Sequence, residues 1–380
     1  MNETKNRYLE LDNVDRRTID ALKGIGILWI VLVHYGLNTT NSFIGSFVFQ
    51  GARGVQLMFL INGFLIFNSL DKNQESEIKW RKKKFIRLIP MYYFFTILWF
   101  LLYRNQERYW LGSLSDISIV NLMANLLFIH GLFPYYINSI NINWFIADLA
   151  ILYIIAPKLY KVINSLEKAL IAVLLAFPTV WILEKVMMKF KIISIDSIWN
   201  DYVEIIGFHA EFPVILLGIL AYYVVKYIRN DLKIIHKKFF SFSCFCTSFI
   251  LAIIKISNGN NFVVFNTVFS FGIIFFIIFI GQMIYPIKII SNRLWALFGK
   301  HSFGIYLLHI FMIRLWNRLE IRREGNRLVP QILSYVLLGC LTLFLSLISE
   351  YVLENKGVNL LNNFRIKIEK KLALSKEKRH

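Results

Sequence analysis

The sequence predicts an all-α membrane protein, a polytopic helical bundle with about ten transmembrane helices and one further re-entrant or half-helix segment. The 380 residues are 57% hydrophobic and only 18% charged, whereas soluble domains average about half apolar and a quarter charged. Apolar runs near the length of a bilayer span recur along the whole chain. The net charge of +19 is concentrated in short loops between these runs, so it suits membrane topology better than nucleic acid binding.

Eleven apolar segments define the expected helices. Short polar loops separate them, and no loop is long enough to form a soluble domain. The three cysteines lie within apolar segments and lack the spacing of a zinc site, so we expect no metal. The segments lie near residues 20–37, 54–70, 85–103, 117–133, 143–163, 167–188, 205–228, 239–257, 262–285, 301–317 and 330–353.

The distribution of Lys and Arg indicates the topology, because cytoplasmic loops carry an excess of both. Eleven crossings would leave no bias between the two sides, whereas omitting segment 117–133 puts most basic loops on one side. That segment is short and contains Asn121, Asn125 and His130. We therefore expect ten crossings with both termini cytoplasmic. The expected parts are a cytoplasmic tail over 1–19, a transmembrane domain over 20–353 and a basic cytoplasmic tail over 354–380.

The first apolar helix carries two ionisable residues on one face. Lys23 and His34 are eleven positions apart, which on a helix is about three turns, or roughly 16 Å, with almost no angular offset. Ionisable side chains inside a span are costly and are therefore functional candidates. The alternatives are that Lys23 snorkels to the interface as a flanking residue and that a neighbouring helix satisfies an interfacial His34.

The residues around these two positions resemble the opening motif of acyltransferase family 3, a family of integral membrane proteins. That family opens with Arg or Lys, ten residues and then His, in a run such as LDALRGIAxxxVxxxH, and residues 19–34 here read IDALKGIGILWIVLVH. Later segments are similar to further family motifs in the same order. They are GVQLMFLINGFLI at 54–66, KKKFIRLIPMY at 82–92, WFIADLAILY at 144–153 and SFGIYLLH at 302–309.

The chain departs from the family pattern at several polar positions. Gln56 replaces the usual Asp of the second motif, and Asn62 replaces its usual Ser. In the motif that begins at Trp144, Leu149 stands where many members have Glu, and Asp148 lies one residue earlier. The resemblance therefore leaves the role of Asp148 open.

The resemblance implies a membrane O-acyltransferase that moves an acyl group, usually acetyl, from cytoplasmic acyl-coenzyme A to a hydroxyl of a glycan or small-molecule acceptor. A hydroxyl is a poor nucleophile at neutral pH, so it needs a general base to remove its proton. A neutral histidine is suited to this role. We therefore expect acetyl-coenzyme A (acetyl-CoA) as co-substrate, a cell-surface glycan or related acceptor, and His34 as the base. Membrane lipids are the other expected partners, and nucleic acid is not expected.

The phosphates of coenzyme A require cations, and a basic cluster precedes the third apolar segment. Such a cluster also fits the positive-inside bias and anionic lipid. Arg87 differs because it lies inside the apolar segment, three residues before Pro90. Lys23 could meet the same donor or the developing oxyanion. The candidate donor-binding residues are Lys83, Lys84, Arg87 and Arg53, although Arg53 could also be a plain helix-end residue.

Asp148 is the third catalytic candidate, beside His34 and Lys23. A carboxylate inside a span could orient His34, pair with Lys23 or Arg53, or contact sugar hydroxyls. A structural ion pair is the alternative.

Further polar residues in the spans are candidates for lining a cavity or binding the acceptor. Ser302, Tyr306 and His309 are spaced four and three apart and share one helical face. Polar side chains in spans also join helices to one another, so helix packing is the alternative role. The other candidates of this kind are Asn62, Gln56, Trp144 and Glu211.

A transporter or flippase of a glycan or lipid-linked substrate is the alternative function. Its intramembrane charges would line a substrate path. Such proteins often contain repeats with broken helices, and no repeat is evident here. The composition, rich in Lys, Asn and Ile, favours an AT-rich bacterial genome, and hence a bacterial cell membrane as the location.

Overall fold

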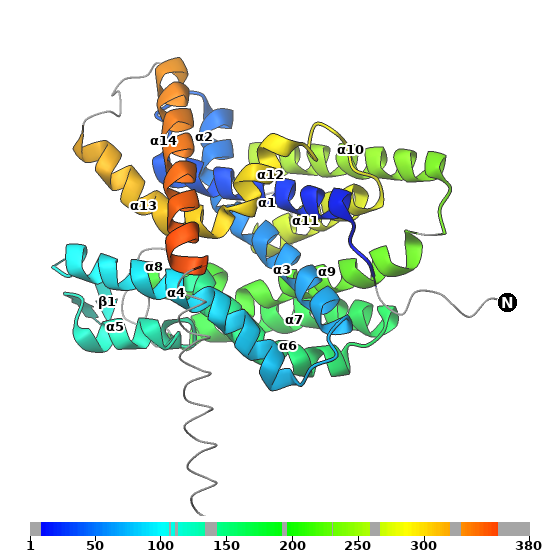
Figure 1. Ribbon diagram of the computed structural model, residues 1–380, viewed down its shortest axis with the longest axis horizontal. Coiled ribbons are helices and arrows are strands. Elements are labelled where there is room, and N and C mark those ends of the chain that lie inside the picture. Colours follow the sequence, from blue (N-terminus) through cyan, green and yellow to red (C-terminus); the bar gives the residue numbers. More distant parts are fainter. Residues whose placement is uncertain are drawn as a thin grey trace, which may run out of the picture.

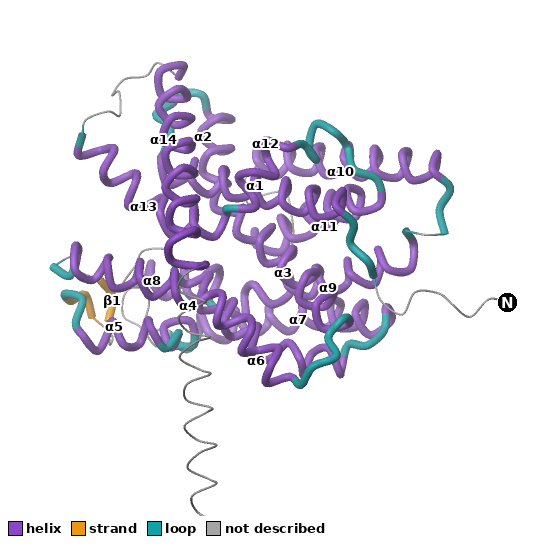
Figure 2. The backbone as a smooth tube through the Cα atoms, viewed as in Figure 1, coloured by secondary structure: helices purple, strands orange, loops and turns teal. Residues whose placement is uncertain are grey.

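The fold is all-α, as the sequence predicts (Figures 1 and 2). The computed structural model describes residues 9–105, 108–110, 113–133, 143–191, 196–229, 231–258, 267–319 and 328–355. Within these ranges one small hairpin interrupts the helices, in which β1 (Arg108–Trp110) pairs antiparallel with β2 (Ser113–Ser115). The tail expected over 354–380 lies almost entirely outside the described residues.

All ten apolar segments that we expected to cross form long helices, and shorter helical pieces connect them. The long helices are α1 (Asn13–Tyr35), α3 (Gly54–Asp71), α4 (Glu77–Tyr103), α6 (Trp144–Val162), α7 (Leu166–Lys189), α9 (Phe208–Ile228), α10 (Ile234–Asn258), α11 (Thr267–Ile284), α13 (Ser302–Arg318) and α14 (Leu328–Ser349). The shorter ones are α2 (Ser42–Phe49), η1 (Gln50–Arg53), α5 (Ile119–Leu126), η2 (Ile129–Gly131), α8 (Asp196–Asp201), η4 (Tyr202–Ile206), α12 (Arg293–Lys300) and η6 (Glu350–Asn355).

The lengths and composition of these helices suit a multi-pass membrane protein. In the described part of the chain, 8 helical stretches are long and apolar enough to cross a membrane. Helices α12 and α13 meet at a bend of 76°, and counting this pair as one span raises the number to 9. Helix α6 has 19 residues, but it carries three charged residues, Asp148, Lys158 and Lys161, and does not qualify on composition. With α6 included, these stretches correspond to the ten expected crossings.

The segment that we expected not to cross contains only α5 and η2. Helix α5 has 8 residues, far fewer than the roughly 20 that span a bilayer. Its polar face is buried against protein. Asn143 Nδ2 donates to Asn125 Oδ1 at 2.5 Å, and the Tyr92 hydroxyl donates to the Asn125 main-chain carbonyl at 3.0 Å. A half-helix is tolerated at membrane depth where protein satisfies it in this way.

Helix α1 begins before its apolar run, because a capping box starts it. The Asp12 side chain accepts a hydrogen bond from the Asp15 backbone, and the Asp15 side chain accepts one from the Asp12 backbone. Asp15 also pairs with Arg229 at the end of α9, at 2.6 Å. We call the side of the bundle where α1 begins the Lys23 side and the side where α1 ends the His34 side.

Helix α3 is the central helix of the bundle. It packs against α1, α6, α9 and α11, and Figure 1 shows it between α1 and α9. Phe59 and Phe64 are completely buried. At the Lys23 side, Asp71 at the end of α3 accepts hydrogen bonds from the Tyr160 and Tyr222 hydroxyls and forms an ion pair with Lys226 at 2.8 Å. This carboxylate therefore ties α3 to α6 and α9.

Helices α1 and α12 cross with almost no space between their backbones. A Cβ atom on Gly24 would lie 1.9 Å from the Trp295 carbonyl oxygen, and one on Gly299 would lie 1.6 Å from the Asp20 carbonyl oxygen. Both positions therefore require glycine. The crossing matters for the site described below, because it holds Lys300, the residue after Gly299, next to Lys23.

Replacing Gly299 with alanine is expected to push α12 away from α1. The clash is with backbone, which cannot rotate aside, and overpacking of this kind costs about 1–3 kcal/mol. Thermal unfolding of the detergent-purified protein would measure the loss. Gly45→Ala is the matched control, because its Cβ would come no closer than 3.9 Å to Thr39 Cγ2. Equal melting temperatures for the two variants would contradict the close crossing.

Candidate active site

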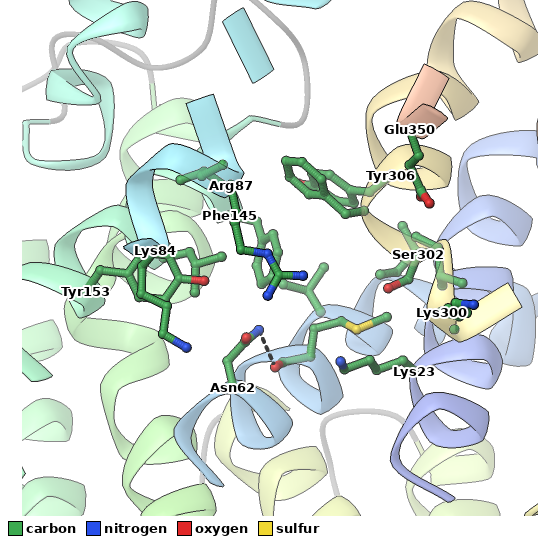
Figure 3. A pocket seen from close by; sticks show the side chains of 18 residues that line it. Lys23, Asn62, Lys84, Arg87, Phe145, Tyr153, Lys300, Ser302, Tyr306 and Glu350 are labelled. Carbon is green, nitrogen blue, oxygen red and sulfur yellow. Dashed lines mark hydrogen bonds between the residues drawn. The ribbon is translucent and has the colours of Figure 1, made fainter. Parts of the chain in front are cut away.

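A cavity of about 280 Å³ lies between α1, α3, α4, α6, α12, α13 and the start of η6 (Figure 3). It has charged walls at one end and apolar walls at the other. Its lining residues are Lys23, Ile27 and Ile30 from α1; Val55, Met58 and Asn62 from α3; Lys84, Arg87 and Leu88 from α4; Phe145, Leu149 and Tyr153 from α6; Gly299 and Lys300 from α12; Ser302, Phe303 and Tyr306 from α13; and Glu350.

Four cations gather at the Lys23 side of this cavity. They are Lys23 from α1, Lys84 and Arg87 from α4, and Lys300 from α12, and Figure 3 shows them around one space. Arg87 and Lys300 are exposed, which indicates that this end is accessible to solvent. Lys84 lies over the Trp80 ring, 5.1 Å from its centroid. Lys23 forms an ion pair with Asp20 at 3.9 Å, and Glu350 lines the same cavity, but the cations outnumber these carboxylates, so this end suits a ligand with several negative charges.

The opposite end of the cavity is apolar and stops short of His34. Along α1 the lining runs from Lys23 through Ile27 to Ile30, a rise of roughly 10 Å. Met58 faces this end from α3. His34 follows Ile30 by one further turn, about 6 Å, and is exposed at the end of α1. Lys23 therefore lines the cavity and His34 does not, because the cavity ends one turn earlier.

His309 lies beside His34 and beside Tyr306. The ring centroids of His34 and His309 are 5.2 Å apart, with an angle of 45° between the ring planes. His309 is completely buried, and its Nδ1 lies 2.7 Å from the main-chain oxygen of Tyr306. The Tyr306 side chain lines the cavity. Helix α13 thus connects His34 to the cavity through two of its residues.

Two charged residues of the cavity lining, Lys300 and Glu350, were missed by sequence reasoning. Glu350 is held on both oxygens, by His301 Nδ1 at 2.5 Å and by Ser346 Oγ at 3.2 Å. It lies at the very end of the last apolar segment, where a charge gives no functional signal. Lys300 ends the 8-residue helix α12, which is too short to stand out in a hydropathy pattern. Neither residue belongs to a motif.

The cavity brings together some of the candidate residues and leaves Lys83 out. Lys83 is 67% exposed and pairs with Glu75 at 2.7 Å on the surface. This hydrogen bond lowers the pKa of the Glu75 carboxyl. Asn62 lines the cavity, and its Nδ2 donates to the Met58 carbonyl one turn back. The candidates that line the cavity are Lys23, Asn62, Lys84, Arg87, Ser302 and Tyr306.

A second polar group lies at the His34 side, where α3 and α9 begin. Gln56 Nε2 donates a hydrogen bond to Glu211 Oε1, and both residues are completely buried. Arg53, only 7% exposed, lies within electrostatic range of Glu211. The second carboxylate oxygen of Glu211 has no hydrogen-bond partner among the described residues. These three candidates therefore lie together, apart from the cavity.

Asp148 belongs to the same region but contacts none of the partners we considered for it. It is completely buried, and neither carboxylate oxygen has a hydrogen-bond partner in the described part of the chain. No salt bridge to Lys23, His34 or Arg53 forms there. Trp144, one turn earlier on α6, packs against Phe59 with ring centroids 6.1 Å apart. Asp148 is thus a buried carboxylate with unused acceptor capacity.

The described residues contain no cluster of three or more His, Cys, Asp or Glu side chains that could hold a metal ion. Cys244, Cys246 and Cys340 are free.

Comparison with known proteins agrees with the resemblance seen in the sequence. A family model described as an acyltransferase domain matches residues 16–351, which is most of the chain. No curated protein and no solved structure matches it. The match begins in α1 before Lys23 and ends at the residue after Glu350, so it contains the whole cavity and both histidines. The chain therefore belongs to acyltransferase family 3 and is a multi-pass membrane acyltransferase.

Proposed function

We propose that this protein is an O-acyltransferase of the bacterial cell membrane that moves an acyl group, acetyl in the first instance, from cytoplasmic acyl-CoA to a hydroxyl acceptor. His34 is the general base in this proposal. The polarity of the cavity is the observation that carries it. Four cations lie at one end, and the apolar end stops one helical turn from an accessible histidine.

The cations are suited to the phosphates of the donor. Coenzyme A carries a pyrophosphate and a ribose phosphate, and Arg87 can contact a phosphate with two parallel hydrogen bonds. Lys23, Lys84 and Lys300 supply point charges around it. Because Lys23 lies about three turns from His34, it suits the phosphates better than the oxyanion at the reacting carbon. The loop charges favour a cytoplasmic location for this end of the bundle, and with it for both termini.

The acyl thioester then lies at the apolar end, between Ile30 and Tyr306. His34 takes the proton of the acceptor hydroxyl while the hydroxyl oxygen attacks the thioester carbonyl carbon. The carbon–sulfur bond breaks, the thiolate takes up the proton that His34 holds, and the products are an ester, free coenzyme A and neutral His34. Positioned general base catalysis contributes about 10²–10⁴-fold to such a step.

The acceptor in this proposal is a hydroxyl-rich molecule, a cell-surface glycan or a related small molecule, that approaches from the His34 side. Asp148 and Glu211 lie there with carboxylate oxygens that no described residue satisfies. Carboxylates accept hydrogen bonds from hydroxyls. Arg53 adds an N–H donor to the same region, and Gln56 adds an amide oxygen that no described residue satisfies. These four residues support a polyol more than an apolar acceptor.

Two adjacent lysines provide the test of the donor assignment. Lys84 lines the cavity, whereas Lys83 is exposed and paired with Glu75. We expect Lys84→Ala to weaken acetyl-CoA binding by roughly tenfold, since a hydrogen bond to a charged group contributes about 1.5 kcal/mol or more. Lys83→Ala should bind as the wild type does. Calorimetry on the detergent-purified protein measures acetyl-CoA binding by each variant. Release of free coenzyme A measures its turnover.

The wild type itself decides between the two functions considered for this chain. Binding and slow turnover of acetyl-CoA would support the acyltransferase. If the wild type bound no acyl-CoA, whether acetyl or longer, the donor assignment would be wrong and a transporter would become the better hypothesis.

A further inference from the structure

We propose that His309 is the residue that positions His34. Its Nε2 atom accepts a hydrogen bond from the His34 ring when His34 carries the proton taken from the acceptor. This inference rests on the proposed function, because it concerns the orientation of the proposed base. It is carried by the contact between the two rings and by a buried nitrogen that no described residue satisfies.

The protonation of His309 follows from its surroundings. Nδ1 lies 2.7 Å from the main-chain oxygen of Tyr306, and a carbonyl oxygen can only accept a hydrogen bond. Nδ1 therefore carries the proton. A neutral imidazole has one N–H group, so Nε2 presents a lone pair. His309 is completely buried, and Nε2 has no hydrogen-bond partner among the described residues.

The His34 ring is close enough to use that lone pair. The ring centroids are 5.2 Å apart and the ring planes are tilted by 45°, and in this proposal one N–H group of His34 turns toward Nε2. A buried polar atom is normally satisfied. A protonated His34 offers two N–H donors, so one can face Nε2 while the other faces the acceptor oxygen.

A carboxylate usually orients a catalytic histidine, but Asp148 does not do so here. Neither of its oxygens bonds to His34. His309 occupies the neighbouring place instead, and it is uncharged. It can therefore fix the His34 ring without neutralising it, which makes it a positioning residue and leaves the catalytic role to His34.

The same arrangement ties the base to the donor cavity. The Tyr306 side chain lines the cavity, while its carbonyl holds His309 in one tautomer. The Tyr306 and His309 rings also lie 5.8 Å apart. A donor packed against Tyr306 thus contacts the element that sets the orientation of His34.

Two substitutions separate the nitrogens of His309. Asparagine keeps an N–H donor near the Nδ1 position and removes the Nε2 acceptor, whereas glutamine can place an amide oxygen near the Nε2 position. We expect His309→Asn to lower kcat about tenfold to hundredfold, by analogy with loss of the partner that orients a metal-bound histidine. The KM for acetyl-CoA should stay unchanged, and His309→Gln should recover part of kcat. His236→Gln, at an exposed position near the start of α10, should behave as the wild type.

Several results would overturn this inference without touching the donor assignment. One is a wild-type kcat in His309→Asn, measured beside an inactive His34→Ala. A raised KM with unchanged kcat would make His309 only part of the cavity wall. If neither variant folds, nitrogen-15 NMR of the histidines in the wild type gives the answer. The proton of His309 should lie on Nδ1, and a proton on Nε2 would contradict the proposal.

Discussion

His34→Ala is expected to lower acyl transfer by about 10²–10⁴-fold, the range for loss of a positioned general base, and to leave acetyl-CoA affinity unchanged. The separation of the two effects follows from the cavity. Its walls end near Ile30, one turn before His34, and its cations lie still farther away. A donor bound there makes no contact that alanine at this position would remove.

The measurement compares binding and turnover on the same protein preparations. Calorimetry gives the affinity for acetyl-CoA, and the appearance of free thiol gives the rate. His236→Ala is the matched control, because His236 is exposed near the start of α10 and outside the cavity. Full turnover in His34→Ala would make His34 structural, and Asp148 would become the next candidate for the base. Loss of binding together with turnover would mean that His34 supports the fold of the cavity.

The fold was predictable because the information for it is local. A bilayer demands a long apolar run for each crossing, and the predicted crossings contain such runs, although the run of α6 includes three charged residues. Segment 117–133 was separable for the same reason, since its polar residues interrupt the run. The start of α1 was placed too late because its first turn is stabilised by the Asp12 capping box and contains polar residues. Hydropathy does not register this local effect.

The site was less predictable because its geometry depends on contacts between distant segments. Lys83 and Lys84 lie four and three residues before Arg87, so helical spacing alone allows either to share its face. The packing of α4 selects Lys84. Lys300 reaches the cavity only because Gly24 and Gly299 let α12 touch α1. No pattern within a single helix contains that information.

The two polar groups at the His34 side illustrate the same limit. The sequence identified Asp148 as a buried carboxylate but suggested partners that the structure does not bring to it. Glu211 instead bonds to Gln56 across the start of two helices, 155 positions apart in the chain. Such a contact is set by how α3 crosses α9, where Gly63 and Gly218 allow close approach. The roles of these side chains toward an acceptor stay predictions.

Arg87→Ala is expected to weaken acetyl-CoA binding about tenfold to hundredfold. Hydrogen bonds to charged groups contribute about 1.5–3 kcal/mol, and each 1.4 kcal/mol is a factor of ten in affinity. Arg87→Lys should lie between this variant and the wild type, because lysine keeps the charge and loses the planar fork. Added salt should weaken acetyl-CoA binding to the wild type more than binding to Arg87→Ala. Salt screens charges, and the variant has one cation fewer at the site.

A comparison of acetyl-CoA with its 3′-dephospho form locates the contact within the donor. If Arg87 binds the ribose phosphate, the alanine variant should no longer distinguish the two molecules. If it binds the pyrophosphate, the substitution should weaken both by the same factor. Unchanged affinity for both would show that Arg87 does not meet the donor. That result, together with an unaffected Lys84→Ala, would remove the phosphates from this cavity and leave its four cations without a ligand.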